Sequence, residues 1–303
     1  MESMEIPHLI IILKMIKNLL IEHISENVKD DIVAVLMSGG VDRLSVAFAA
    51  HDVGKRVVGY TFCLENDETY DYLKAKEVCA DMGWECNPFH VPTTNLVEDW
   101  HRLVKLGCRK KTHFETVFPF LYVYPNIYAK YVLTGWGADG YFGPSKKAMM
   151  RYSSIRKAKN YINYCKRFYK IKGKLPRDKR LTWNKFRLDY LDGDCAGYNE
   201  HTTLAKQHNK IHIAPYKDSK DIRELLMKKT WRELNKPIQK DIIRKDFTNL
   251  KKYGTIKPHI NLHLGANINK LFETLLEDDD INFNNRKRMM DVCRDWYEKE
   301  NTI

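Results

Sequence analysis

A short glycine motif between a strand-like run and a helix-like run constrains this chain more than any other feature. Residues 31–37 have β-type composition, residues 44–50 are helix-like, and between them stand Ser38, Gly39, Gly40, Val41 and Asp42. Glycines at such a junction let the backbone approach a ligand closely, and the free N–H groups of the first helical turn favour an anion. Ser38 adds a hydroxyl donor, and Asp42 is placed to hold a divalent metal that bridges phosphates. The motif therefore predicts a site for the pyrophosphate part of a nucleotide.

The segments that follow alternate between strand-like and helix-like patterns. Residues 56–62, 85–91 and 131–134 are strand-like, and residues 69–82 form a helix-like stretch with one apolar face. A second helix-like stretch, 117–131, is interrupted by two prolines. This alternation predicts an α/β fold, with a doubly wound, mostly parallel sheet and helices on both of its faces. Ligands of such sheets bind at the carboxyl ends of the strands, where the first motif falls.

A second glycine-rich loop follows the strand-like residues 131–134. It reads Thr134, Gly135, Trp136, Gly137, Ala138, Asp139, Gly140, Tyr141, Phe142 and Gly143. By itself this loop is either a structural turn or the second half of the nucleotide site. In the second case Asp42 and Asp139 share a Mg²⁺ ion, and phosphate oxygens complete its coordination shell.

Both loops resemble known family motifs. The first matches the PP-loop ATP pyrophosphatase signature, Ser-Gly-Gly-x-Asp-Ser, at five of six positions. Arg43 replaces the last serine of that signature, so it either contacts phosphate itself or alters nucleotide binding. The second loop resembles the Ser/Thr-Gly-x-Gly-Ala/Ser-Asp-Glu-x-Phe-Gly motif of asparagine synthetases and β-lactam synthetases. Segments 213–218, 240–244 and 257–268 resemble later motifs of these families more weakly.

The resemblance implies a PP-loop, HUP-like fold with additional helical segments, and it divides the chain into four parts. These are an N-terminal amphipathic helix (1–28), an ATP-binding core (29–145), a basic helical insertion (146–195) and a helical C-terminal part that completes a synthetase-like domain (196–303).

Members of these families use ATP and Mg²⁺ to adenylate a substrate carboxylate, release pyrophosphate, and form an amide when an amine displaces AMP. The resemblance therefore implies an AMP-forming C–N ligase of asparagine-synthetase type that acts on a small-molecule or nucleotide carboxylate. The implied ATP contacts are Ser38, Gly39, Gly40, Val41, Asp42, Arg43, Tyr60, Thr61, Phe62, Gly135, Trp136 and Gly137. The implied metal ligands are Asp42 and Asp139, and the implied catalytic residues are Asp139 and Lys257.

The chain departs from the family pattern where the amide-forming step takes place. Trp136 stands where the family has a Glu or Tyr of its acid–base pair, and indole does not exchange protons at a useful pKa. The family's Glu and Arg before Pro-Phe fall on Ile211 and Ile213. Lys257 is the nearest match to a late family lysine, although a gap-free alignment puts His259 there. Four polar residues without another assigned role are candidates to replace these family residues: His113, Glu115, Asp192 and Asp194.

These departures leave two alternatives open. One is a catalytically weak protein that keeps a nucleotide as a structural or regulatory ligand. The other is a PP-loop enzyme that modifies a nucleobase or nucleotide on DNA or RNA.

Asparagine synthetases usually also carry a glutaminase domain before the first loop, and none precedes it here. We therefore expect the amine to be free ammonia, the product of a separate glutaminase, or part of the substrate.

A basic block supports the nucleic-acid alternative. The net charge of the chain is +12, and residues 145–187 hold sixteen Lys or Arg against one acidic residue, which makes this segment alone +15. Aromatic residues interleave the charges, as in surfaces that bind nucleic acid, although the same pattern suits a helix with a solvated face. The candidate polyanion contacts are Lys146, Lys147, Arg151, Arg156 and Lys157.

Composition narrows the cellular setting. The seven cysteines form no Cys-x-x-Cys pair, which disfavours a structural zinc site and suits a reducing, cytoplasmic environment. Residues 6–21 are apolar but carry lysines and a histidine, so we expect an amphipathic helix on the domain and no membrane span.

Overall fold

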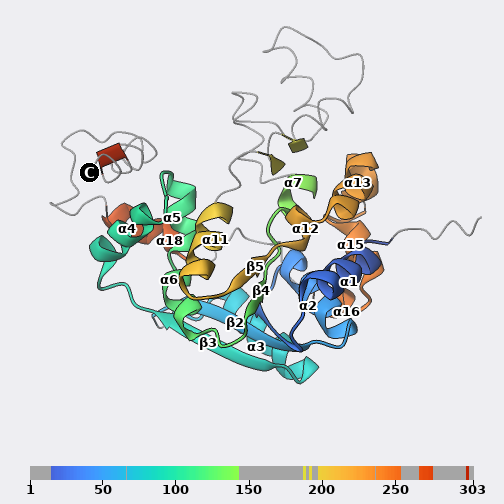
Figure 1. Ribbon diagram of the computed structural model, residues 1–303, viewed down its shortest axis with the longest axis horizontal. Helices are drawn as coiled ribbons and strands as arrows, with labels where there is room; N and C mark the ends of the chain where they lie inside the picture. The colour runs from blue at the N-terminus through green and yellow to red at the C-terminus, as the bar shows by residue number, and fades with distance from the viewer. Residues whose placement is uncertain are drawn as a thin grey trace, which may run out of the picture.

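The computed structural model describes residues 15–65, 67–142, 187–188, 191–192, 197–235, 237–253, 266–275 and 298–299. Five parallel strands form one sheet in the order β3-β2-β1-β4-β5. Their bounds are β1 Ile32–Leu36, β2 Arg56–Leu64, β3 Glu85–Val91, β4 Tyr131–Leu133 and β5 Ile211–Ile213. The predicted α/β fold with a doubly wound parallel sheet is confirmed (Figure 1).

The central strand is apolar along its whole length because both of its faces are covered. Val33 and Val35 belong to one buried cluster, while Ala34 and Leu36 belong to the cluster on the other face. Strands that are buried on both sides have the near-continuous hydrophobic sequence seen in β1.

Helices cover the two faces in two groups (Figure 1). The first group contains α1 Ile16–Asn27, α2 Val41–Asp52, α3 Tyr70–Met82, α7 Ala138–Phe142, α12 Pro215–Asp218, α13 Lys220–Lys228, α14 Trp231–Asn235, α15 Asp241–Asp246 and α16 Asn249–Tyr253. The second group contains α4 Leu96–Lys105, α5 Lys111–Val117, α6 Phe120–Val123, the 3₁₀ turn η1 Tyr124–Asn126, α11 Tyr198–Gln207 and α18 Ile268–Leu275. Each group buries its apolar stripe against the sheet, which is the arrangement of a three-layer α/β domain.

Apart from shifts of up to three residues at element ends, the elements differ from the sequence-based ones in two places. Pro119 separates α5, which ends at Val117, from α6, because proline lacks the N–H that continues a helix. The expected helical stretch 117–131 therefore contains only α6 and η1, and η1 ends at Asn126. The strand β5 was not predicted, since its three residues include the polar His212 and form no apolar run like that of β4.

The sheet order brings the two glycine loops together. The first loop leaves β1 and the second leaves β4, and these two strands are hydrogen-bonded neighbours. Residues 1–14 and 146–186 lie outside the described residues, so the start of the N-terminal part and most of the basic insertion stay predictions. Within the described residues, every helix is too short or too polar to traverse a lipid bilayer.

Candidate functional site

The first loop continues the sheet and then turns directly into α2. The backbone N–H of Met37 donates to the carbonyl of Tyr60 at 2.7 Å, and the N–H of Gly40 donates to Ser38 Oγ at 3.3 Å. Gly40 precedes the first residue of α2, and Asp42 lies in the first turn of that helix. Gly40, the N-cap residue of α2, has no side chain with which to cap the helix, and the N–H groups at the start of a helix favour an anion.

The second loop packs directly against the first. A Cβ atom at Gly135 would lie 2.9 Å from both the backbone carbon and the Cβ of Asp42. Gly137 has a φ of +89°, and a Cβ there would lie 3.0 Å from the backbone nitrogen of Lys217. Glycine is required at both positions, because a side chain would separate the two loops or strain the backbone. Asp139 follows in the first turn of α7, on the Asp42 side of the loop.

One lysine joins the two predicted metal ligands. The Lys240 ammonium donates to Asp139 Oδ1 at 2.7 Å and also forms a short ion pair with Asp42 Oδ2. The side chain of Lys240 is 6% exposed, whereas those of Asp42 and Asp139 are 15% and 43% exposed. Burial on its own would lower the pKa of Lys240, but the carboxylates of Asp139 and Asp42 raise it above its ordinary value. The structure thus brings Asp42 and Asp139 within reach of a single cation.

The backbone around Lys240 places this ammonium. Lys240 precedes α15 with a φ of +58°, in the left-handed region that non-glycine residues rarely adopt. Its N–H donates to Asn235 Oδ1 at 3.0 Å, and Asn235 Nδ2 donates to the carbonyl of Phe142 at 3.0 Å. Phe142 ends α7, the helix that carries Asp139, so Lys240 is held against the second loop by its backbone as well as by its side chain.

Arg43 adds a second cation to the site. It is half-buried, and three carboxylates act on it: those of Asp71, Asp42 and Asp139. Burial lowers the pKa of Arg43 and the carboxylates oppose that shift, so the guanidinium stays charged at neutral pH. The residue that departs from the PP-loop signature therefore lies among the acidic groups of the site.

A buried tyrosine supports the first loop from the far half of the chain. Ser45 Oγ donates to the backbone carbonyl of Asp42 at 2.9 Å and shares a 2.8 Å hydrogen bond with the hydroxyl of Tyr216. Tyr216 is fully buried, and burial raises its pKa well above the usual value. The pair ties the first turn of α2 to α12, which follows β5.

The predicted adenine contacts lie on β2, beside the first loop. Tyr60, Thr61 and Phe62 are all buried. The Tyr60 ring stacks on Phe89, and its hydroxyl accepts a hydrogen bond from the N–H of Tyr128, just before β4 begins. The side chain of Tyr60 therefore belongs to the core, and a nucleoside contact from this residue would have to come from its backbone.

Trp136 lies against the buried His201, which in turn contacts the half-buried His212. Its ring centroid is 5.4 Å from that of His201, which in turn lies 5.9 Å from His212. Burial lowers the pKa of His201 to about 3 and that of His212 to about 4, so both rings are neutral near pH 7. His212 Nε2 lies 2.9 Å from Thr134 Oγ1, at the start of the second loop. Sequence reasoning missed this histidine pair, although His212 stands between the two isoleucines that replace family charges.

Ile211 and Ile213 flank His212 on β5 but differ in exposure. Ile211 is 42% exposed, whereas Ile213 is buried against the first helix group.

The sequence places Lys240 only in a weak motif, and that motif suggests no role for it. The signal that could have identified it is a lysine at the start of a short helix that also carries Asp241 and Arg244.

The substitute polar residues are engaged elsewhere. His113 Nδ1 lies 2.8 Å from Glu200 Oε1, and Glu115 pairs with Lys111 at 3.3 Å, both inside the second helix group. Asp192 pairs with Arg223 at 2.8 Å on the surface. The remaining candidates lie outside the described residues: Asp194, Lys257, His259, Lys146, Lys147, Arg151, Arg156 and Lys157.

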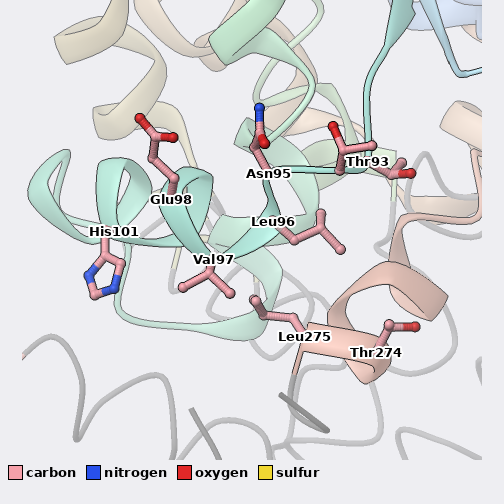
Figure 2. Close-up of a pocket in the computed structure, with 9 residues that line it drawn as sticks. Thr93, Asn95, Leu96, Val97, Glu98, His101, Thr274 and Leu275 are labelled. Atoms are coloured by element: carbon pink, nitrogen blue, oxygen red, sulfur yellow. The ribbon is translucent and has the colours of Figure 1, made fainter. Parts of the chain in front are cut away.

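A separate cavity of about 600 Å³ opens at the carboxyl end of β3. It is lined by Thr93, Thr94, Asn95, Leu96, Val97, Glu98, His101, Thr274 and Leu275 (Figure 2). Among these lining residues there is no Lys or Arg, and Glu98 is acidic, so the cavity is unsuited to a polyphosphate. It shares no residue with either glycine loop.

The acidic residues between the loops fit a magnesium ion that arrives with a nucleotide. Mg²⁺ is usually bound by one or two carboxylates, and substrate phosphates and waters complete its octahedron. Asp42 and Asp139 provide two such carboxylates, and within the described residues no cluster of three or more metal-ligating side chains forms a complete cage. The donor set therefore suits Mg²⁺ shared with phosphate oxygens.

Two comparisons with known proteins bear on the family of this chain. The family model described as asparagine synthase matches residues 16–251, which is well over half of the chain and includes both glycine loops and Lys240. A search of curated proteins found no significant match.

Proposed function

The chain belongs to the asparagine synthase family of ATP-using ligases, and from that premise we propose that it is an AMP-forming amide ligase. It adenylates a substrate carboxylate, and an amine then displaces AMP. The observation that supports this proposal most directly is the shared contact of Asp42 and Asp139 with Lys240 between two glycine loops. The arrangement gathers carboxylates, cations and the N-terminus of a helix at the carboxyl ends of β1 and β4.

In the first half-reaction a carboxylate oxygen of the substrate attacks the α-phosphorus of ATP. The bond between this phosphorus and the bridging oxygen breaks, and pyrophosphate leaves with the electron pair. The N–H groups at the start of α2, together with Arg43 and Lys240, are placed to absorb the charge on pyrophosphate. Asp42 and Asp139 would hold Mg²⁺, which supplies further charge neutralisation to the phosphates when bound.

In the second half-reaction the amine nitrogen attacks the acyl carbon of the adenylate. The acyl C–O bond breaks, AMP leaves, and the amine loses a proton. Trp136 cannot take that proton. The neutral His212 ring, hydrogen-bonded to Thr134 at the start of the second loop, is a base beside this loop. We assign the proton-accepting role to His212 as part of the proposal.

The sheet order suggests where each substrate binds. The phosphate loops lie on β1 and β4, the predicted nucleoside contacts are on β2, and β5 stands on the opposite side of β4. The acyl substrate therefore belongs near Trp136 and the end of β5. The assay below is designed to identify the carboxylate and the source of the amine, including a separate glutaminase partner.

The test is to incubate the full chain with ATP, Mg²⁺, ammonia and a panel of carboxylates, and to measure pyrophosphate and AMP. We expect equal amounts of both, and formation of ADP with phosphate would contradict the proposal. Asp42→Asn should abolish pyrophosphate release. Asp52→Asn is the matched control, because Asp52 ends the same helix and pairs with Lys17 at 2.8 Å on the surface.

The weak nucleotide-binding alternative predicts a different result. It is favoured by Trp136, since no acidic or phenolic group stands at that loop position. Under this alternative the protein binds ATP, but no carboxylate in the panel stimulates pyrophosphate release. The nucleic-acid alternative rests on the charge of residues 145–187, and it predicts pyrophosphate release that depends on added DNA or RNA.

A further inference from the structure

The side chain of Lys240 bridges the two candidate metal ligands. Its ammonium contacts Asp42 Oδ2 and Asp139 Oδ1 at the same time. These are the two carboxylates that the fold offers to magnesium. A divalent ion between them and the Lys240 ammonium therefore compete for the same oxygens.

The surrounding charges favour the Lys240 ammonium over a free metal ion in this competition. Asp42, Asp71 and Asp139 bring three negative charges, and Arg43, Lys240 and Arg244 bring three positive ones. A free metal ion that displaced Lys240 would leave a 6% exposed ammonium without its counter-ions. Removing the partners of a buried charge is costly, because the charge has already lost its hydration.

The backbone prevents Lys240 from simply leaving. Asn235 holds the N–H of Lys240, and the ring of Phe142 lies 5.9 Å from its ammonium. Since the backbone is fixed and the side chain is only 6% exposed, the ammonium needs a new anion close by when it releases the carboxylates. A bound triphosphate is such an anion.

We infer that Lys240 is an internal counter-ion that excludes free divalent metal from Asp42 and Asp139, so that Mg²⁺ binds there only together with a triphosphate. This inference rests on the proposed function in one respect, namely that the ligand is a nucleoside triphosphate. In the resting protein the ammonium keeps the two carboxylates together. When the nucleotide arrives with its metal, the ammonium moves from the carboxylates to the phosphates.

The experiment uses Mn²⁺ as a spectroscopic substitute for Mg²⁺, titrated into the full chain without nucleotide. We compare wild type, Lys240→Met and Lys245→Met. Lys245 is the matched control because it lies on the same helix, is 68% exposed and pairs with Asp241 at 2.6 Å. Lys240→Met should bind one Mn²⁺ more than about tenfold tighter than wild type and Lys245→Met. Asp139→Asn added to Lys240→Met should remove this gain. Equal Mn²⁺ affinity of wild type and Lys240→Met would overturn the inference.

A second measurement needs no variant and stands if Lys240→Met fails to fold. Wild-type protein is titrated with Mn²⁺ in the absence and presence of an ATP analogue that cannot be cleaved. The inference expects protein-bound Mn²⁺ only with the analogue, at a level above that of the analogue alone. Tight Mn²⁺ binding to wild type without the analogue overturns it. Neither readout depends on turnover, so a protein that passes both tests but releases no pyrophosphate would contradict the proposed reaction and leave the role of Lys240 intact.

Discussion

Gly135 of the second loop lies in direct contact with Asp42 of the first. The backbone carbon and Cβ of Asp42 are both 2.9 Å from the position that a Cβ on Gly135 would occupy. These atoms are part of the main chain or next to it and cannot rotate away. The absence of a side chain at Gly135 therefore sets the distance between the two loops.

Gly135→Ala should push the loops apart. We expect a loss of about 1–3 kcal/mol in the free energy of unfolding, as for other overpacked sites, and at least about tenfold weaker binding of an ATP analogue, because the phosphate ligands are misplaced. Denaturant unfolding and calorimetric titration measure the two effects. The control is Gly54→Ala, which puts a side chain at φ +83° with open space around it, in the turn between α2 and β2. It should cost about 1 kcal/mol of stability and leave analogue binding unchanged.

The hydrogen bond between Tyr216 and Ser45 should measurably couple the two halves of the chain. Tyr216→Phe removes a fully buried hydroxyl that lies 2.8 Å from Ser45 Oγ. A double-mutant cycle with Ser45→Ala should give a coupling free energy of about 0.5–1.5 kcal/mol. If the two single changes simply add, the hydrogen bond does not stabilise the loop.

Arg187 should be a strong stabilising residue. It is fully buried, and its guanidinium donates to the carbonyls of Leu226 at 2.6 Å and Met227 at 2.7 Å, at the end of α13. Arg187→Met should lower the free energy of unfolding by about 3 kcal/mol, because charge-assisted hydrogen bonds to two backbone carbonyls are removed. Arg223→Met is the control: it breaks a surface ion pair with Asp192 and should cost less than about 1 kcal/mol. Equal effects of the two changes would argue against a structural role for Arg187.

His201 should make the stability depend on pH below neutrality. Burial lowers its pKa to about 3 in the folded state, against 6.5 for an ordinary histidine. Between these values the unfolded state binds one more proton than the folded state. The stabilisation is therefore complete above pH 6.5 and declines as the pH falls, by up to about 1.4 kcal/mol per pH unit. Urea unfolding at pH 7, 6 and 5 should show this slope reduced in His201→Gln, whereas between pH 7 and 8 the two proteins should respond alike.

The basic segment provides a test for a nucleic-acid partner. A variant with Lys146, Lys147, Arg151, Arg156 and Lys157 changed to Gln has five fewer positive charges. If the segment binds a duplex, the slope of log affinity against log salt should become shallower by up to about 0.9 for each phosphate that the variant no longer neutralises. Fluorescence anisotropy with labelled DNA and RNA at several salt concentrations measures this. An unchanged slope would indicate that these residues form an ordinary solvated surface.

Local sequence was sufficient for the part of the site that is contiguous in the chain. The run 31–37, the glycines and the following helix form one β1–loop–α2 unit, and each signal lies within a few residues of the next. The same holds for β3, whose predicted and observed bounds coincide at Glu85–Val91. The side chain of Tyr60 shows the limit of that reasoning: its strand was predicted correctly, but its packing on Phe89 depends on the neighbouring strand.

The sequence by itself determined the fold class, both glycine loops and the two aspartates, because strand periodicity and turn chemistry are short-range properties. The contact of Lys240 with Asp42 joins residues 198 positions apart, and that of Tyr216 with Ser45 joins residues 171 positions apart. No local pattern encodes such pairs. They exist because the parallel sheet places β1, β4 and β5 side by side and the helices that follow β5 return across α2. Only the tertiary structure could decide that a lysine, held by its own backbone, stands between the two carboxylates.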